Sequence, residues 1–108
     1  MIVQYASDLH MEFHENKEYL MKFPLLPNGD VLILAGDIVP FNEFDKHQDF
    51  FDYISGKFEI TFWVPGNHEY YKSDITVKSG ILHEEIRNNV FLVNDTTIIY
   101  NDIRFIFS

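Results

Sequence analysis

The chain has 108 residues, of which 46% are apolar and 17% aromatic, enough for one domain with a core of its own. It contains no cysteine, which excludes disulfides and cysteine-based zinc sites. With 17 acidic and 8 basic residues the formal charge is −9, which argues against non-specific nucleic-acid binding. The N-terminus lacks the pattern of a signal peptide and no apolar run approaches the ~20 residues of a membrane span, so we expect a cytoplasmic protein without membrane contact.

Three short apolar segments, residues 2–6, 31–35 and 60–64, predict strands of a parallel sheet. The middle one, Val-Leu-Ile-Leu-Ala, is continuously apolar, which is typical of a strand covered on both faces. Between the strands, residues 15–22 and 43–55 place apolar side chains at helical spacing. The alternation predicts an α/β fold that begins with a parallel β-α-β-α-β unit.

The rest of the chain predicts a different arrangement. A further short helix is expected over residues 81–88. Three short strands, residues 90–93, 96–100 and 103–107, follow with Asn-Asp turns between them and predict an antiparallel meander. An apolar strand so near the last residue leaves an open sheet edge. We therefore expect residues 1–108 to be a single, truncated domain.

Polar residues follow each predicted parallel strand. Asp8 and His10 come after the first strand, Asp37 after the second and Asn67 after the third. Because the carboxyl ends of parallel strands lie at one edge of a sheet, we expect these side chains to converge there. Two carboxylates, an imidazole and an amide oxygen suit Mn, Fe or Zn better than Ca.

Such a set predicts a two-metal hydrolytic site. Two ions about 3.5–4 Å apart would generate hydroxide at neutral pH and hold a phosphoryl group for in-line attack. Asp37, from the central strand, is the natural bridging carboxylate. His68, beside Asn67, is placed to protonate a leaving oxygen as a general acid.

The three clusters, Asp8-x-His10, Gly36-Asp37 and Gly66-Asn67-His68-Glu69, closely resemble the first three motifs of the calcineurin-like metallophosphoesterase family, DxH, GD and GNH(D/E). The resemblance covers most of residues 1–70 and implies the N-terminal part of an α/β sandwich of two sheets flanked by helices. It implies hydrolysis of phosphate esters, monoesters or diesters, with two divalent ions (Mn, Fe or Zn) as cofactors. The residues it implies are the metal ligands Asp8, His10, Asp37 and Asn67 and the catalytic His68.

The sequence departs from the family pattern after Glu69. The family supplies a further lone histidine and a Gly-His-x-His motif, but this sequence has only His83 downstream and no Gly-His pair. The ligand set for two ions is therefore incomplete in these 108 residues. We expect the isolated chain to be inactive or weakly active.

Two alternatives remain at this point. The chain can be a non-catalytic domain that assembles through its open C-terminal strand edge with a second copy or another partner. Alternatively, a partner chain donates the missing histidines across that edge, and activity then appears only in the complex.

The remaining polar residues of interest have simpler interpretations. We expect His14 on a helix surface, His47 half-buried in packing and His83 on the helix predicted over residues 81–88. Glu69 is expected to stabilise the start of a following helix rather than to bind metal.

Overall fold

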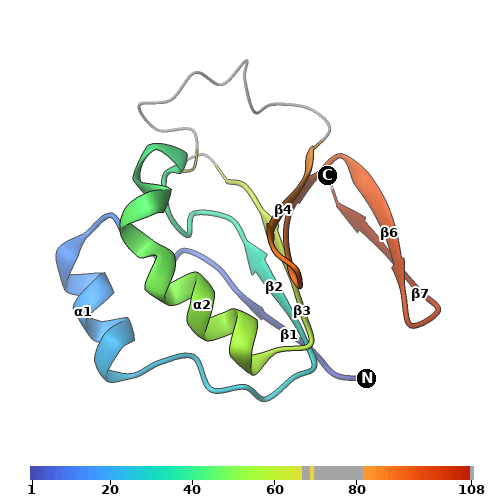
Figure 1. Cartoon of the computed structure of the whole chain (residues 1–108), viewed down its shortest axis with the longest axis horizontal. Helices are drawn as coiled ribbons and strands as arrows, with labels where there is room; N and C mark the ends of the chain where they lie inside the picture. Colours follow the sequence, from blue (N-terminus) through green and yellow to red (C-terminus); the bar gives the residue numbers. More distant parts are fainter. Residues whose placement is uncertain (67–68, 70–81, 108) are drawn as a thin grey trace.

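The computed structural model describes residues 1–66, 69 and 82–107. Within these residues a five-stranded sheet has the order β1-β2-β3-β5-β4, and two further strands pair as a separate hairpin (Figure 1). The strands are β1 (Val3–Ala6), β2 (Val31–Ala35), β3 (Ile60–Val64), β4 (Leu82–Arg87), β5 (Val90–Asn94), β6 (Thr96–Tyr100) and β7 (Ile103–Phe107). The helical segments are α1 (His14–Lys22), the 3-10 helix η1 (Phe41–His47) and α2 (Gln48–Lys57).

The predicted parallel β-α-β-α-β unit is confirmed. β1 pairs with β2 and β2 with β3, both in parallel, so the three strands end at the same edge of the sheet. The second predicted helix is divided in the structure: η1 gives way to α2 at His47, whose φ of −126° interrupts the regular α geometry. The helix was predicted to end at residue 55, but α2 continues to Lys57 and includes Gly56.

The helix predicted over residues 81–88 is wrong. Residues 82–87 form strand β4, which pairs antiparallel with β5 at the border of the main sheet. Leu82 is buried and Ile86 half-buried, while His83 and Glu85 point to solvent, as a strand with one covered face requires. The meander is also only partly correct, because β5 joins the main sheet in parallel with β3 and only β6 and β7 form a separate antiparallel pair.

The main sheet is covered on both faces. Leu32 and Leu34 of β2 and Trp63 of β3 pack with residues of α2, including Phe51 and Ile54. The alternate residues of the same strands, with Phe62 at the centre, pack against Phe105 and Phe107 of the hairpin. Successive residues of a strand point to opposite faces, so one apolar strand serves both layers. Helices and hairpin therefore lie on opposite faces of the sheet (Figure 1).

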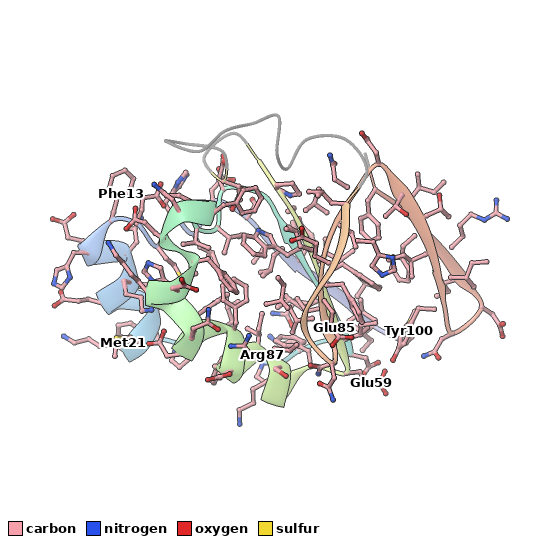
Figure 2. The ribbon with its side chains drawn as sticks, turned by 45° about the horizontal axis from the view of Figure 1, so that its top comes forward. Phe13, Met21, Glu59, Glu85, Arg87 and Tyr100 are labelled. Carbon is pink, nitrogen blue, oxygen red and sulfur yellow. The ribbon has the colours of Figure 1, made fainter. Side chains whose placement is uncertain are left out.

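Polar contacts join the outer elements to this core. Tyr100 of the hairpin donates a hydrogen bond to Glu59, just before β3, at 3.0 Å (Figure 2). Arg87 of β4 pairs with Asp52 of α2 and donates to the Gln48 side chain at 2.6 Å. No helix in the described ranges is long and apolar enough to cross a membrane.

Candidate metal centre

The loops that follow β1 and β2 run side by side beyond the sheet. Backbone hydrogen bonds join them residue by residue: Asp8 N to Gly36 O at 3.0 Å, His10 N to Asp37 O at 3.0 Å and Met11 N to Ile38 O at 2.9 Å. The pairing of β1 with β2 is thus continued past the strand ends. It fixes the register of the first two predicted polar clusters.

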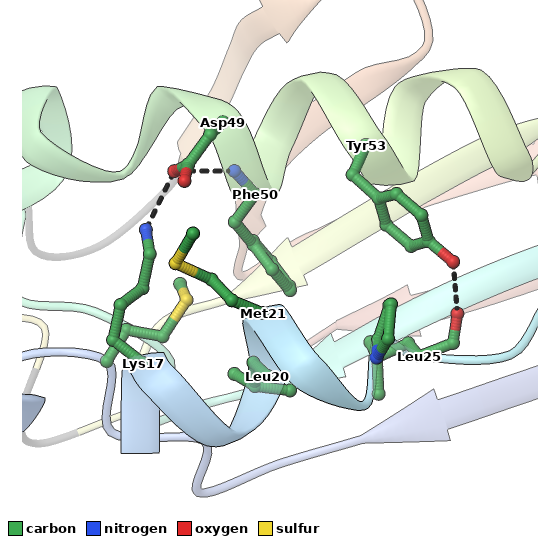
Figure 3. A pocket seen from close by; sticks show the side chains of 9 residues that line it. Lys17, Leu20, Met21, Leu25, Asp49, Phe50 and Tyr53 are labelled. Carbon is green, nitrogen blue, oxygen red and sulfur yellow. Dashed lines mark hydrogen bonds and ion pairs between the residues drawn. The ribbon is translucent and has the colours of Figure 1, made fainter. Parts of the chain in front are cut away.

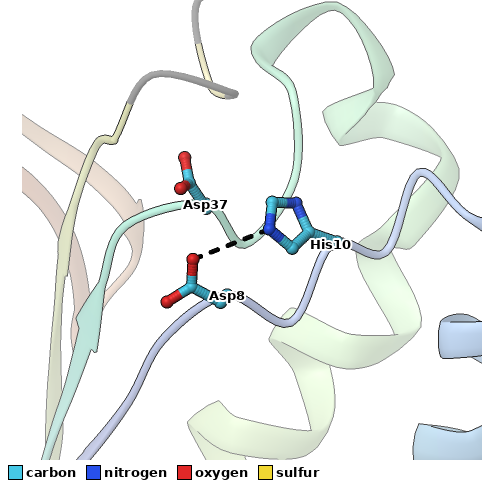
Figure 4. Close-up of side chains that lie close together, drawn as sticks. All are labelled: Asp8, His10 and Asp37. Carbon is cyan, nitrogen blue, oxygen red and sulfur yellow. Dashed lines mark ion pairs between the residues drawn. The ribbon is translucent and has the colours of Figure 1, made fainter.

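Asp8, His10 and Asp37 converge at this edge (Figure 4). One ligand atom from each lies within 4.8 Å of the others, and Nε2 of His10 is 3.6 Å from Oδ1 of Asp8. The Asp8 side chain is 64% exposed, whereas that of His10 is 20% exposed. Ser7 donates its hydroxyl to Oδ2 of Asp8 at 2.8 Å, which leaves Oδ1 facing the imidazole.

The same three residues have left-handed backbone conformations. The φ angles are 58° at Asp8, 46° at His10 and 57° at Asp37. Residues other than glycine adopt this backbone conformation at a cost in free energy. Aspartate, asparagine and histidine are among those that tolerate it best. Such strain clusters at functional sites, where surrounding contacts hold it. Here the ladder of backbone hydrogen bonds between the two loops supplies those contacts.

Two glycines allow the loops after β2 and β3 to approach each other. Gly36 has a φ of 88°, and a Cβ there would lie 3.1 Å from the Cα of Gly66. A Cβ on Gly66 would lie 2.6 Å from Oδ1 of Asp37. Both glycines of the predicted motifs are therefore needed for close approach, and the second one borders the candidate ligand directly.

Glu69 holds the loop that carries Asp37. Its carboxylate is fully buried and accepts five hydrogen bonds from described residues. The backbone donors of Asp37, Ile38 and Val39 lie 2.7, 2.6 and 3.0 Å away. The other two donors are the backbone N of Gly66 and the indole Nε1 of Trp63, at 2.6 and 3.3 Å. Sequence reasoning missed this role, because it expected Glu69 only to stabilise the start of a following helix.

Further polar contacts fix His10, and sequence reasoning did not identify them. The Asn16 side chain in α1 donates to the carbonyl oxygen of His10 at 3.2 Å, and the backbone N of Phe13 donates to the same oxygen at 3.1 Å. The signal available in the sequence was an asparagine in the first turn of the helix that follows the motif. Asn67 and His68, the remaining predicted site residues, lie outside the described residues.

The other histidines that the structure describes lie outside this group. His14 begins α1, where it is exposed and contacts Glu18 at 3.1 Å. His83 is exposed on β4 rather than on a helix, with its ring 5.6 Å from that of Phe91. His47 is more deeply buried than expected and its Nδ1 lies 3.0 Å from Nζ of Lys17.

Lys17 also borders a pocket between α1 and α2 (Figure 3). Its ammonium pairs with Asp49 at 2.7 Å, and Tyr53 donates to the Leu25 carbonyl at 2.8 Å. The hydrogen bond from Lys17 lowers the pKa of Asp49, and burial together with Lys17 lowers the pKa of His47. The pocket shares no lining residue with the Asp8, His10 and Asp37 group.

Comparisons with known proteins assign the chain to a family. The family model described as calcineurin-like phosphoesterase matches residues 4–107. The chain belongs to this family. A curated relative, the uncharacterized protein L509 of Acanthamoeba polyphaga mimivirus, is 36% identical over 121 aligned residues. The match covers 97% of this chain and 42% of the relative, so the chain spans less than half of that protein's length. No solved structure gives a significant match.

Calcineurin-like phosphoesterases are metal-dependent hydrolases of phosphate esters. The group of Asp8, His10 and Asp37 has the chemistry to hold a divalent metal ion. Two carboxylates and one imidazole present oxygen and nitrogen donors that suit Mn, Fe or Zn. The distance of 3.6 Å between Nε2 of His10 and Oδ1 of Asp8 is longer than a good hydrogen bond. It allows both atoms to face one cation. The fold of an α/β phosphoesterase domain is thus present together with a donor set of the right chemistry.

Proposed function

We propose that this chain carries the N-terminal metal-binding part of a hydrolase acting on phosphate esters. The observation that carries the proposal is the convergence of Asp8, His10 and Asp37 within 4.8 Å at the carboxyl edge of the parallel strands. These residues match the family motifs in order, and the family model covers nearly the whole chain.

The proposed roles follow the family pattern. Asp8 and His10 would hold one divalent ion, Asn67 would hold the second, and Asp37 would contribute to holding both. When bound, the ions supply positive charge to the phosphoryl oxygens and lower the pKa of water. His68 then donates a proton to the leaving oxygen.

The described residues support such a site through position and exposure. Asp8 is open to solvent, so its side of the site is accessible to a substrate, while His10 and Asp37 are half-buried and held by backbone contacts. Glu69 keeps the Asp37 loop in place without adding a ligand to the group. The chain itself thus preorganises three donors before any ion arrives.

We propose that activity needs histidines beyond those in this chain. The sequence contains five histidines, and neither His14 nor His83 lies at the group. With only part of the ligand set, we expect one Mn²⁺ per chain and little or no hydrolysis of p-nitrophenyl phosphate. Supplying the missing histidines, from further residues or from a partner chain, would allow two ions to bind and the ester to be hydrolysed.

Calorimetric titration with Mn²⁺ tests the proposal. We expect Asp37→Asn to weaken binding at least tenfold, because it removes the charge of a central donor. The matched control is Asp95→Asn, since Asp95 is an exposed aspartate that also has a positive φ, 48°. Equal affinity of wild type and Asp37→Asn, or no binding by either, would contradict a metal centre in this chain.

The hairpin supports a second candidate function. Its outward face exposes Ile99 and Ile106, which are 68% and 72% accessible. This apolar face suits a non-catalytic domain that pairs with a second copy of the chain. Sedimentation analysis distinguishes the two candidate functions. A wild-type dimer that becomes monomeric in Ile106→Lys, together with the absence of Mn²⁺ binding, would favour assembly over hydrolysis.

A further inference from the structure

Glu12 is a largely buried carboxylate that belongs to none of the motifs. Its side chain is 10% exposed, and its Oε1 has no hydrogen-bond partner among the described residues. Burying a carboxylate with an unpaired oxygen is unfavourable unless another interaction compensates. The residue before it, Met11, is part of the core, so the backbone here is fixed. A buried acid at this point needs an explanation.

The other oxygen of Glu12 contacts His10. Oε2 lies 3.4 Å from Nδ1 of His10, while Nε2, on the far side of the ring, lies 3.6 Å from Oδ1 of Asp8. Both carboxylates can only accept, and of the two only Glu12 lies within hydrogen-bond distance of the ring, so the hydrogen of a neutral imidazole sits on Nδ1. Nε2 then presents a lone pair toward Asp8. Two acceptors that face each other across a short gap make a place for a cation.

We propose that Glu12 is a positioning residue for the metal centre: it fixes the tautomer and ring orientation of His10 so that Nε2 is the ligand atom. The proposal rests on the proposed function, because it concerns the same centre. A carboxylate behind a metal-bound histidine also raises the electron density of the ring and hence its strength as a ligand. Glu12 acts through His10 and touches no ion itself.

The backbone contacts of His10 show what this carboxylate adds. Hydrogen bonds from Asn16 and Phe13 hold the His10 carbonyl, and His10 N donates to Asp37, so its backbone is fixed. Hydrogen bonds to the backbone do not select which ring nitrogen faces the group. The bond from Nδ1 to Glu12 does, because turning the ring over would place a carbon atom opposite the carboxylate.

The test combines Mn²⁺ calorimetry with ring ¹⁵N spectra of His10 in the metal-free protein at pH 8. Glu12→Leu removes the acceptor, Glu12→Gln retains an acceptor without the charge, and Glu15→Gln, at an exposed carboxylate on α1, is the matched control. We expect wild type to show the Nδ1–H tautomer. We expect Mn²⁺ affinity to fall about 10- to 100-fold in Glu12→Leu, less in Glu12→Gln and less than twofold in Glu15→Gln.

The two readouts separate the inference from the proposed function. A wild-type chain that binds no Mn²⁺ contradicts the proposed function, and the tautomer spectra then decide the role of Glu12 alone. An Nε2–H tautomer in wild type overturns the inference, as does a Glu12→Leu protein with unchanged tautomer and affinity. Thermal unfolding of each variant shows whether it is folded, since a merely structural role would lower stability without changing the tautomer.

Discussion

Gly66 lies so close to Asp37 that a single methyl group between them would be 2.6 Å from the Oδ1 atom of the carboxylate and 2.9 Å from its backbone N. Gly66→Ala must therefore displace the Asp37 loop, and overpacking of this kind costs about 1–3 kcal/mol. We expect a lower free energy of unfolding and at least tenfold weaker Mn²⁺ binding, measured by urea titration and calorimetry. Gly56→Ala is the control, because nothing lies within 4 Å of a Cβ added there. Replacing glycine by alanine inside a helix stabilises the folded protein by about 0.5–1 kcal/mol.

Glu69→Gln tests the buried carboxylate. The variant keeps the shape but turns one acceptor oxygen into an NH₂ group that faces N–H donors. Hydrogen bonds to charged groups contribute about 1.5–3 kcal/mol each, so we expect a loss of about 2–4 kcal/mol in urea unfolding. Glu18→Gln, on the surface of α1, should change stability by less than about 0.5 kcal/mol. Equal stability of the two variants would contradict the role assigned to Glu69.

The strand at residues 82–87 shows where sequence reasoning fails. Leu82 and Ile86 are four residues apart, a spacing that suits one face of a helix and, being even, one face of a strand. Glu84, Glu85 and Arg87 favour a helix by intrinsic propensity. The same charges protect a border strand from pairing with other chains, and tertiary pairing with β5 decides the outcome.

Some residues of the candidate site were predictable from the sequence and others were not. Asp8, His10 and Asp37 were predictable because strand ends in a parallel sheet share one edge, and this convergence is confirmed for these three residues. Glu12 and Glu69 were not predictable. Their partners are an imidazole and backbone N–H groups whose positions depend on how the loops after β1 and β2 run together. Their burial follows from packing, which local sequence does not encode.

His47 should make stability sensitive to mild acid. Burial, and then Lys17, lowers the pKa of His47 below its ordinary value of 6.5, while Glu43 and Asp49 act in the opposite direction and Lys46 adds to the lowering. The unfolded chain therefore takes up the proton first, and the folded state loses stability as the pH falls through about 6.5. We expect the free energy of unfolding, measured with urea, to fall more between pH 8 and pH 5 for wild type than for His47→Gln.

The window above pH 5 isolates this effect. Asp49 has a lowered pKa because Lys17 hydrogen-bonds to it, so its contribution is present above its ordinary value of 3.8 and lost only below that. A wild-type protein whose pH dependence matches that of His47→Gln across this window would contradict the assignment.

Phe62 joins the hairpin to the main sheet. Its ring lies 5.5 Å from that of Phe105 and 5.2 Å from that of Phe107. Phe62→Ala removes a buried aromatic, a change that costs about 3–5 kcal/mol in well-packed cores. In native-state hydrogen exchange we expect residues 96–107 to lose protection first, before β1 and β2. Ile99→Ala, on the exposed face of the hairpin, should leave exchange unchanged.

The left-handed residues of the group suggest a substitution that stabilises the fold at the expense of binding. Asp8 has a φ of 58°, which glycine adopts without cost, so Asp8→Gly should raise the free energy of unfolding by about 1 kcal/mol while weakening Mn²⁺ binding. Urea titration and calorimetry of this one variant measure both effects. A stability loss would show that the side-chain contacts of Asp8 outweigh its backbone strain.

This has a consequence for how such a site persists through evolution. At Asp8, His10 and Asp37 the proposed metal ligands are not the residues that this backbone conformation favours most. Selection for stability alone would favour glycine at positions where it adopts this conformation at a lower cost. Under the proposed function, aspartate and histidine at these positions are kept for what the edge of the sheet binds.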